Sequence, residues 1–222
     1  DLPNGFCLLS NISIAVEAAL AEKLTEGVAI VDWDVHHGNG TEAIFYDRAD
    51  VLTISIHQDR CYPIDTGAAT DIGVDRGEGY NMNIPLPPGG GHTLYLEAME
   101  RLILPRLREF QPDIIIIACG FDASAIDPLA RMLATSETFG QLTKFVMGAA
   151  HELCSDRLSM IHEGGYSEVY VPFCGHRVIQ ELSNSSIKAE DPYKFLFESR
   201  QPSKRVQNFY SELITELEQF FF

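Results

Sequence analysis

The segment from Val28 to Thr41, VAIVDWDVHHGNGT, places two carboxylates and two imidazoles at the end of an apolar run. Ionisable groups at the tip of a buried strand are costly to desolvate unless they have a partner. A metal ion compensates several carboxylates and orients an imidazole at the same time. Asp34 and His36 are two residues apart, so both face the same way if the strand stays regular. The segment is therefore expected to supply half of a metal site.

Two further strands end in groups that could complete this site. Asp122 follows the apolar run DIIIIACGF, and Tyr166 follows LSMIHEGG. In open parallel α/β sheets, ligands gather at the carboxyl ends of strands. Asp34, His36 and Asp122 would give two carboxylates, one imidazole and an open fourth position, which is the arrangement of a catalytic zinc. Iron or manganese would also suit this oxygen-rich set.

The remaining polar residues of this pattern are expected to support the site. Asp32 could orient a histidine or bind a monovalent cation together with main-chain carbonyls. His37 points away from His36 and is expected to be a supporting histidine. Tyr166 follows Gly164 and Gly165, where backbone can approach a ligand closely. The segment PPGGGH lacks phosphate-loop spacing and is predicted to be a surface turn. No chemistry is assigned to the histidines without ligand spacing, which are His57, His92, His151, His162 and His176.

Apolar strands that alternate with helices must position these groups. Strands are predicted over 28–34, 51–57, 80–86, 114–119 and 158–163. Helices are predicted over 12–24, 42–47, 93–110, 136–154 and 206–221, and Pro105 is expected to kink or break the third of these. The alternation favours a parallel sheet covered on both faces, within one α/β domain.

Composition excludes several classes of protein. The 222 residues carry a net charge of −16, which disfavours nucleic-acid binding because phosphate contacts need clustered Lys and Arg. No apolar run is long enough to span a membrane. Five scattered cysteines indicate reduced thiols in a cytoplasmic protein. The Phe220-Phe221-Phe222 end suits packing against a second copy, as in a homo-oligomer. The chain begins at Asp1 without Met, which we interpret as the C-terminal portion of a longer domain.

The motifs DWDVHHGNGT, SIH, GYNMNIPLP, GFDAS and EGGY, in this order, resemble the histone deacetylase superfamily. They are most similar to its class II branch, and to bacterial histone deacetylase-like amidohydrolases and acetylpolyamine amidohydrolases. The resemblance implies a three-layer, arginase-like α/β fold with a mostly parallel central sheet, of which residues 1–222 form the C-terminal portion. It also implies zinc-dependent hydrolysis of the acetyl amide of acetyl-lysine, or of a related acetylated amine, to acetate and a free amine.

The resemblance further implies three metal sites. The zinc ligands would be Asp34, His36 and Asp122. A structural potassium ion would lie near Asp32, Asp34, His36, Ser55 and Ile56. A second potassium ion would lie near Phe45, Arg48, Val51 and Tyr80.

The resemblance also assigns substrate contacts. Gly5 and Phe6 would lie on the acyl-lysine channel and Tyr62 on its facing wall, so that two aromatic rings enclose the lysine stem. Gly164 and Gly165 would line the pocket, and Tyr166 would donate a hydrogen bond to the substrate carbonyl. The substrate would be an acetylated lysine peptide or an acetylpolyamine.

One family motif is not in the sequence. The family's proton-transfer pair, a His-His in a PPGHH motif, would fall before Asp1. His36-His37 cannot replace it, because His36 is already a metal ligand. Asn39 stands where class I members carry an Asp that partners one of those histidines. Two alternatives therefore stay open, an acetylpolyamine amidohydrolase and a truncated, non-catalytic module that binds acyl-lysine or a protein.

Overall fold

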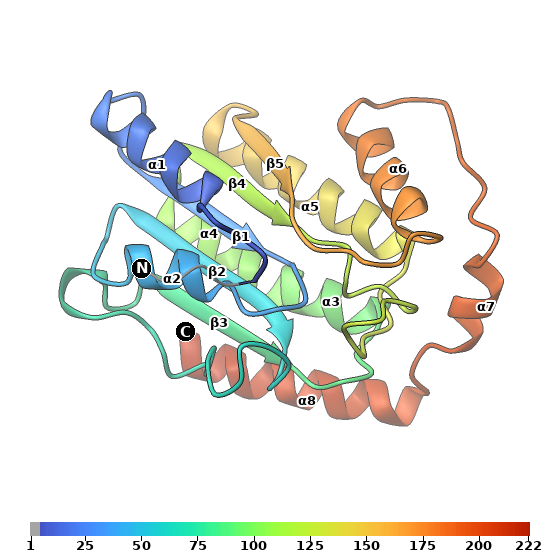
Figure 1. The fold of residues 1–222 in the computed structure, drawn as a ribbon. Helices are drawn as coiled ribbons and strands as arrows, with labels where there is room; N and C mark the ends of the chain where they lie inside the picture. Colours follow the sequence, from blue (N-terminus) through green and yellow to red (C-terminus); the bar gives the residue numbers. More distant parts are fainter. Residues whose placement is uncertain (1–4) are drawn as a thin grey trace.

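Five parallel strands form the centre of the molecule in the computed structural model, which describes residues 5–222 (Figure 1). The strands lie in the order β3-β2-β1-β4-β5, so β1 is central and β3 and β5 are at the edges. Their bounds are β1 Val28–Asp32, β2 Val51–Gln58, β3 Asn81–Leu86, β4 Ile114–Cys119 and β5 Leu158–His162. The predicted parallel α/β sheet is confirmed.

The strands carry the apolar side chains expected of a sheet that is covered on both faces. Every residue of β1 and β2 is buried, and β4 is a run of four isoleucines followed by Ala118 and Cys119. β-Branched residues of this kind are typical of parallel strands. Asp32 is paired in register with Ser55 on one side and Ala118 on the other. Asp32, Ser55 and Ala118 are therefore level with one another, and β2 continues beyond them to Gln58.

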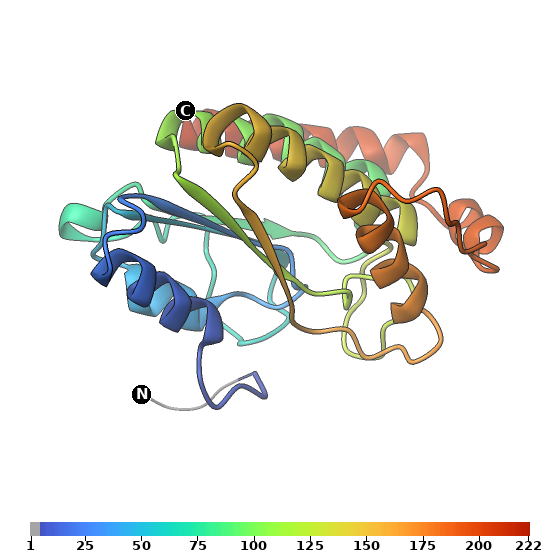
Figure 2. The same ribbon diagram turned by 90° about the horizontal axis from the view of Figure 1, so that it is seen from above.

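Helices cover both faces of the sheet, and Figure 2 shows the three layers from above. One face is covered by α1 (Asn11–Ala21) and α2 (Asn39–Phe45), where Ile12 and Val16 contact the smaller of the two cores. The other face carries the larger core. It is covered by α3 (His92–Ala98), α4 (Leu104–Phe110), α5 (Ser136–Cys154) and α8 (Lys204–Phe221). The predicted three-layer architecture is confirmed.

The sequence did not predict two of the helices, α6 (Val171–Leu182) and α7 (Lys194–Ser199). Cys174 and Val178 are the buried residues of α6, which packs against α5. A short 3-10 turn, η1 (Asp75–Gly77), interrupts the long loop after β2. Within residues 5–222 no helix has the length and apolar character that crossing a bilayer requires.

The helix predicted over 93–110 continues past Pro105. Its middle, η2 (Met99–Ile103), is π-helical and leads directly into α4, where Pro105 occupies one of the first two positions. The helical path therefore changes type at this point instead of ending.

The surface turn predicted at PPGGGH is present at Pro88 and Gly89, but the prediction was wrong for the two glycines that follow. Gly90 and Gly91 are buried, and a Cβ on Gly90 would overlap Leu94 and Met132. The Leu133 N–H donates to the Gly90 carbonyl at 2.8 Å, and the Gly89 N–H donates to Arg131 O at 2.7 Å. The glycines therefore allow close approach of a second backbone segment. β1 also ends at Asp32, two residues earlier than predicted.

Candidate metal centre

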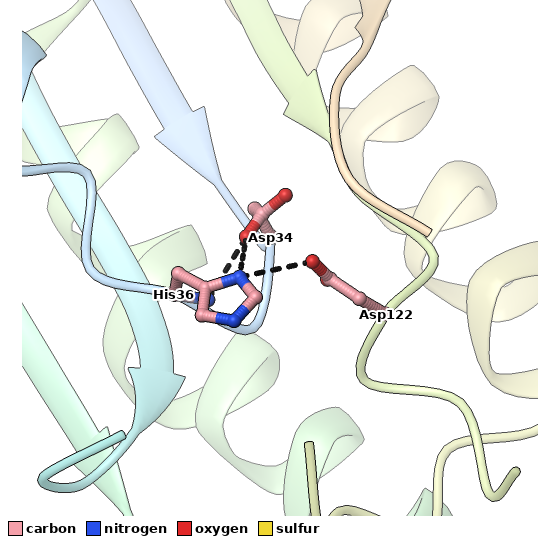
Figure 3. Close-up of side chains that lie close together, drawn as sticks. All are labelled: Asp34, His36 and Asp122. Carbon is pink, nitrogen blue, oxygen red and sulfur yellow. Dashed lines mark hydrogen bonds and ion pairs between the residues drawn. The ribbon is translucent and has the colours of Figure 1, made fainter. Parts of the chain in front are cut away.

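Asp34, His36 and Asp122 meet just beyond the carboxyl ends of β1 and β4 (Figure 3). His36 Nδ1 lies 3.0 Å from Asp34 Oδ1 and 3.1 Å from Asp122 Oδ2. One ligand atom from each residue lies within 4.8 Å of the other two, which is close enough for all three to bind one ion. The loops after two adjacent strands thus place these side chains as the sequence analysis expected.

Carboxylate-to-backbone hydrogen bonds shape the loop that carries the first two residues. Asp32 Oδ1 accepts the N–H of Asp34 at 2.9 Å, and Asp34 Oδ1 accepts the N–H of His36 at 2.9 Å. Asp122 Oδ1 accepts the N–H of Val35 at 2.8 Å and so links the loop to the end of β4. These local turns, and not a continued strand, bring Asp34 and His36 to the same side.

One carboxylate oxygen of this cluster has no hydrogen bond. Asp122 is fully buried, and its Oδ2 accepts none from residues 5–222, although His36 Nδ1 lies at ion-pair distance, 3.1 Å away. A buried, unsatisfied oxygen beside an imidazole nitrogen and a second carboxylate is the donor set of a metal site. Glycine keeps the space open, because a Cβ on Gly120 or Gly164 would overlap the Asp34 carboxylate. The residues present therefore fit a divalent cation.

The pKa values of the cluster show that it needs positive charge. Burial raises the pKa of Asp122 to about 7, against the effect of His36. Burial opposes protonation of His36, but the Asp122 and Asp34 carboxylates outweigh it and raise the pKa of His36 to about 10. Burial and the Asp34 charge raise the pKa of Asp32. A protonated His36 is the positive partner of these carboxylates, and a bound cation would take over that role from the proton.

Three aromatic side chains surround the cluster on its exposed side. The ring centroid of His36 lies 6.1 Å from that of Tyr62 and 6.4 Å from that of Tyr166. The Phe6 ring meets Tyr166 edge-on at 6.0 Å and is 88% exposed, and Gly5 precedes it with φ +56°. Burial, followed by the charges of Asp34 and Asp122, raises the pKa of Tyr166 to about 12. The Tyr166 hydroxyl is therefore a neutral hydrogen-bond donor at neutral pH.

The glycine pair before Tyr166 touches the cluster directly. The Gly164 N–H donates to Asp34 Oδ2 at 2.7 Å, and Gly164 O accepts the N–H of Phe121 at 2.7 Å. Gly165 has φ +136°, a conformation that residues with a Cβ rarely adopt. The chain after β5 is therefore joined to the loops after β1 and β4.

Sequence reasoning missed Glu42, a residue of α2 that contacts His37 in the loop after β1. Its Oε2 accepts hydrogen bonds from Asn81 Nδ2 at 2.7 Å and Asn83 Nδ2 at 2.6 Å, and lies 3.2 Å from His37 Nε2. His37 Nδ1 lies 3.0 Å from Thr66 Oγ1. Glu42 thus joins β3 to the loop that contains His37. Its partners are 39 and 41 residues away along the chain, so no local pattern could have identified it.

The supporting role of Asn39 and the two potassium sites stay predictions. Asn39 begins α2, and its N–H donates to His37 O at 2.8 Å. The first potassium group is contiguous, because Ser55 pairs with Asp32 in register, accepts the Gly38 N–H and precedes Ile56.

In the second group, the Arg48 guanidinium lies 5.8 Å from the ring centroid of Phe45 and binds the Asp50 and Glu17 carboxylates. Val51 begins β2, and Tyr80 O accepts the N–H of Thr53 at 2.9 Å.

Comparison with known proteins adds to this geometry. A model of the histone deacetylase domain matches residues 1–182. A histone deacetylase-like amidohydrolase of Pseudomonas aeruginosa is 51% identical over 217 residues, 98% of this chain and 57% of the relative. A probable deacetylase of Archaeoglobus fulgidus is 38% identical over 194 residues, 86% of this chain and 54% of that protein.

Two solved structures are similar over nearly the whole chain. The HD domain of HDA15 superposes with a TM-score of 0.81 at 34% identity, covering 99% of this chain and 58% of that one. The histone deacetylase Clr3 superposes with a TM-score of 0.80 at 30% identity, covering 100% of this chain and 36% of that one. This chain thus spans between 36% and 58% of the length of these four proteins.

Proposed function

The chain belongs to the histone deacetylase family, and we propose that the protein hydrolyses the acetyl amide of acetyl-lysine, or of a related acetylated amine, with the help of zinc. The observation that carries this proposal is the Asp34–His36–Asp122 cluster with its unsatisfied Asp122 oxygen. Hydrolysis by a deacetylase needs an electrophilic centre at the end of a pocket for the acyl group. This cluster has the donor set for that centre, and it lies beneath aromatic side chains.

Each residue of the site has a role in this reaction. Asp34, His36 and Asp122 would hold the ion. When bound, zinc supplies Lewis-acid polarisation of a carbonyl and lowers the pKa of a water molecule. Tyr166 donates its O–H to the carbonyl oxygen as negative charge develops there, and such donors are each worth about 3 kcal/mol in the transition state. A transfer of protons from the water to the leaving amine is also required. We assign it to the histidine pair that the family resemblance places upstream of Asp1.

The rim of the site supports an acylated amine as substrate. Phe6 and Tyr62 present aromatic surface beside the cluster, which suits the methylene stem of a lysine or a polyamine. Gly164 leaves room at the carboxylates. The net charge of −16 favours encounter with cationic substrates, in line with both a basic peptide and a polyamine.

The test uses the protein expressed from its complete reading frame, assayed with acetyl-lysine peptides and with acetylputrescine. We expect amine release that a chelator abolishes and added zinc restores. D122N keeps an acceptor for the Val35 N–H but loses a ligand, so its metal content after dialysis should fall. The metal affinity should drop by more than the roughly 10- to 100-fold that loss of an outer-shell hydrogen bond costs.

Other outcomes would change the proposal. Binding of the acetylated peptide without turnover would replace it with a non-catalytic module for acyl-lysine recognition. Turnover of acetylputrescine alone would assign the protein to acetylpolyamine hydrolysis. Full metal retention by D122N would refute the assigned ligand set.

A further inference from the structure

We propose that Asp127 is a positioning residue that fixes the backbone of Tyr166, and with it the phenol, against the metal cluster. The effect on chemistry rests on the function proposed above, whereas the positioning itself does not. Asp127 lies five residues after Asp122 in the loop that follows β4, and it is only 7% exposed. Neither its residue type nor its sequence neighbours suggested a role.

The two oxygens of the Asp127 carboxylate bind two different segments. Oδ2 accepts the N–H of Tyr166 at 2.7 Å, across 39 residues of sequence. Oδ1 accepts the N–H of Leu129 at 2.9 Å, which closes a local turn. The carboxylate thus joins the loop after β4 to the loop after β5. Hydrogen bonds from N–H groups to a carboxylate are about twice as strong as those between neutral partners.

Tyr166 needs such an anchor because it follows two glycines and its side chain is partly exposed. Gly164 and Gly165 precede it, and glycine gives the backbone the widest conformational freedom. The Tyr166 side chain is 37% exposed, and its ring contacts are edge-on ones to Phe6 and His36. The phenol must nevertheless stay within hydrogen-bond distance of a reacting carbonyl. A backbone bond at residue 166 itself is the most direct way to hold it.

The use of both oxygens explains why a carboxylate stands at this position. If the side chain bound only the Leu129 N–H, asparagine would serve equally well, because it forms the same local turn. At Asp127 each backbone donor binds its own oxygen, and an asparagine has only one acceptor oxygen. D127N would therefore lose one of the two bonds and place an NH2 group against the remaining N–H. The variant keeps the shape of the side chain and removes the link between the loops.

The first test measures the link without substrate or metal. In protein labelled with 15N and 13C, we expect a scalar coupling across the hydrogen bond between Tyr166 N and Asp127 Cγ. In D127N labelled with 15N on tyrosine alone, the Tyr166 amide, identified by its absence from the same spectrum of Y166F, should shift upfield and exchange with solvent at least about tenfold faster. The other seven of the eight tyrosine amides report whether the fold is kept. An absent coupling, or unchanged Tyr166 exchange in D127N, overturns the proposal.

A matched control is available at the opposite end of the sheet. Asp113 Oδ2 also accepts two backbone N–H groups, those of Glu26 at 2.8 Å and Gly27 at 3.1 Å. D113N replaces a charged acceptor of backbone N–H groups by a neutral amide oxygen far from Tyr166. It should lower the melting temperature and leave the Tyr166 amide unchanged. An equal change at Tyr166 in D113N would show that D127N acts by general loosening, which contradicts the proposal.

The second test asks whether the positioning matters to the site. It uses D127N, Y166F and the double variant of the protein from its complete reading frame. The readouts are kcat, KM and the Kd of a peptide whose acetamide is replaced by a trifluoromethyl ketone, a transition-state mimic that needs no turnover. D127N should lower kcat and weaken mimic binding about tenfold or more, and change KM less than threefold. In the Y166F background, D127N should have almost no further effect.

The results separate the two proposals. Equal effects of D127N with and without the Tyr166 hydroxyl would overturn the positioning role. If the unmodified protein neither turns over substrate nor binds the mimic, the proposed function fails. The positioning role of Asp127 is then tested by the scalar coupling and the Tyr166 amide exchange alone.

Discussion

At the scale of single residues, each carboxylate of the site uses its two oxygens differently. Asp122 binds backbone with Oδ1 and leaves Oδ2 for the ion, whereas Asp127 binds backbone with both. Asp34 Oδ1 lies at hydrogen-bond distance from His36 Nδ1, and Asp34 Oδ2 accepts the N–H of Gly164. Both oxygens of Asp34 also accept backbone N–H groups, so Asp34 differs from Asp127 in having His36 Nδ1 3.0 Å from its Oδ1.

The Tyr166 hydroxyl provides the sharpest prediction at this scale. Y166F should retain its metal and lose about 100- to 1000-fold in kcat, because a donor to the developing oxyanion contributes about that much. Steady-state kinetics and metal analysis of the same preparation measure the two quantities.

Y193F is the matched control for this variant. Tyr193 stacks on Phe197 near α7, away from the metal cluster, and its replacement also removes only a phenol oxygen. Its kcat should equal that of the unmodified protein. A Y166F protein with undiminished kcat would remove Tyr166 from the reaction.

At the scale of elements, Glu42 connects α2 to β3 through Asn81 and Asn83. E42Q places an NH2 group among these amide donors, so the free energy of unfolding should fall by about 1–3 kcal/mol. Urea denaturation measures this loss. In E152Q, where the lost partner is an exposed carboxylate beside Arg108, the change should stay within about 0.5 kcal/mol. Equal losses in both variants would contradict the role of Glu42.

The same residue predicts a pH dependence of stability. Burial acts to raise the pKa of Glu42, but hydrogen bonds from His37 and the two asparagines outweigh it and lower the pKa below its ordinary value of 4.5. Between the two pKa values the unfolded chain binds more protons, so this contribution is complete above pH 4.5 and is lost as the pH falls through the folded-state pKa. The difference in unfolding free energy between the unmodified protein and E42Q should therefore shrink under acid. A pH-independent difference would refute this assignment.

The elements that could be predicted from sequence have strong local patterns. The isoleucine run of β4 and the apolar start of β1 identify strands without further information. α6 was missed because Pro172 and Gly175 weaken its helical pattern, and because α5 provides its packing surface. The buried glycines of PPGGGH were misjudged because their burial depends on Leu133, far along the chain.

The candidate site shows the same division between local and distant information. Asp34, His36 and Asp122 could be found because each follows an apolar strand. Glu42 and Asp127 could not, because the asparagine partners of Glu42 and the Tyr166 partner of Asp127 lie 39 or more residues away. A carboxylate in a loop or on a short helix has no distinctive pattern until its donors are known.

At the scale of the whole molecule, α8 completes the layer that covers the larger core. Ile214 is fully buried, whereas Phe209 on the same helix is 59% exposed. I214A should lower the unfolding free energy by about 2–5 kcal/mol, because it leaves a cavity in that core. F209A should change it by less than about 0.5 kcal/mol. Urea denaturation compares the two, and similar values would show that α8 is not docked as described.

The strand order has a consequence for the sequence of events in folding. The hydrogen bond between Gly164 and Asp34 closes 130 residues of chain, and the one between Val35 and Asp122 closes 87. Contacts of such separation carry a large loop-closure cost and form late. A metal ion would therefore find its ligands together only after β1, β4 and β5 have aligned. It would stabilise the finished domain by mass action and could not act as a nucleus for its assembly.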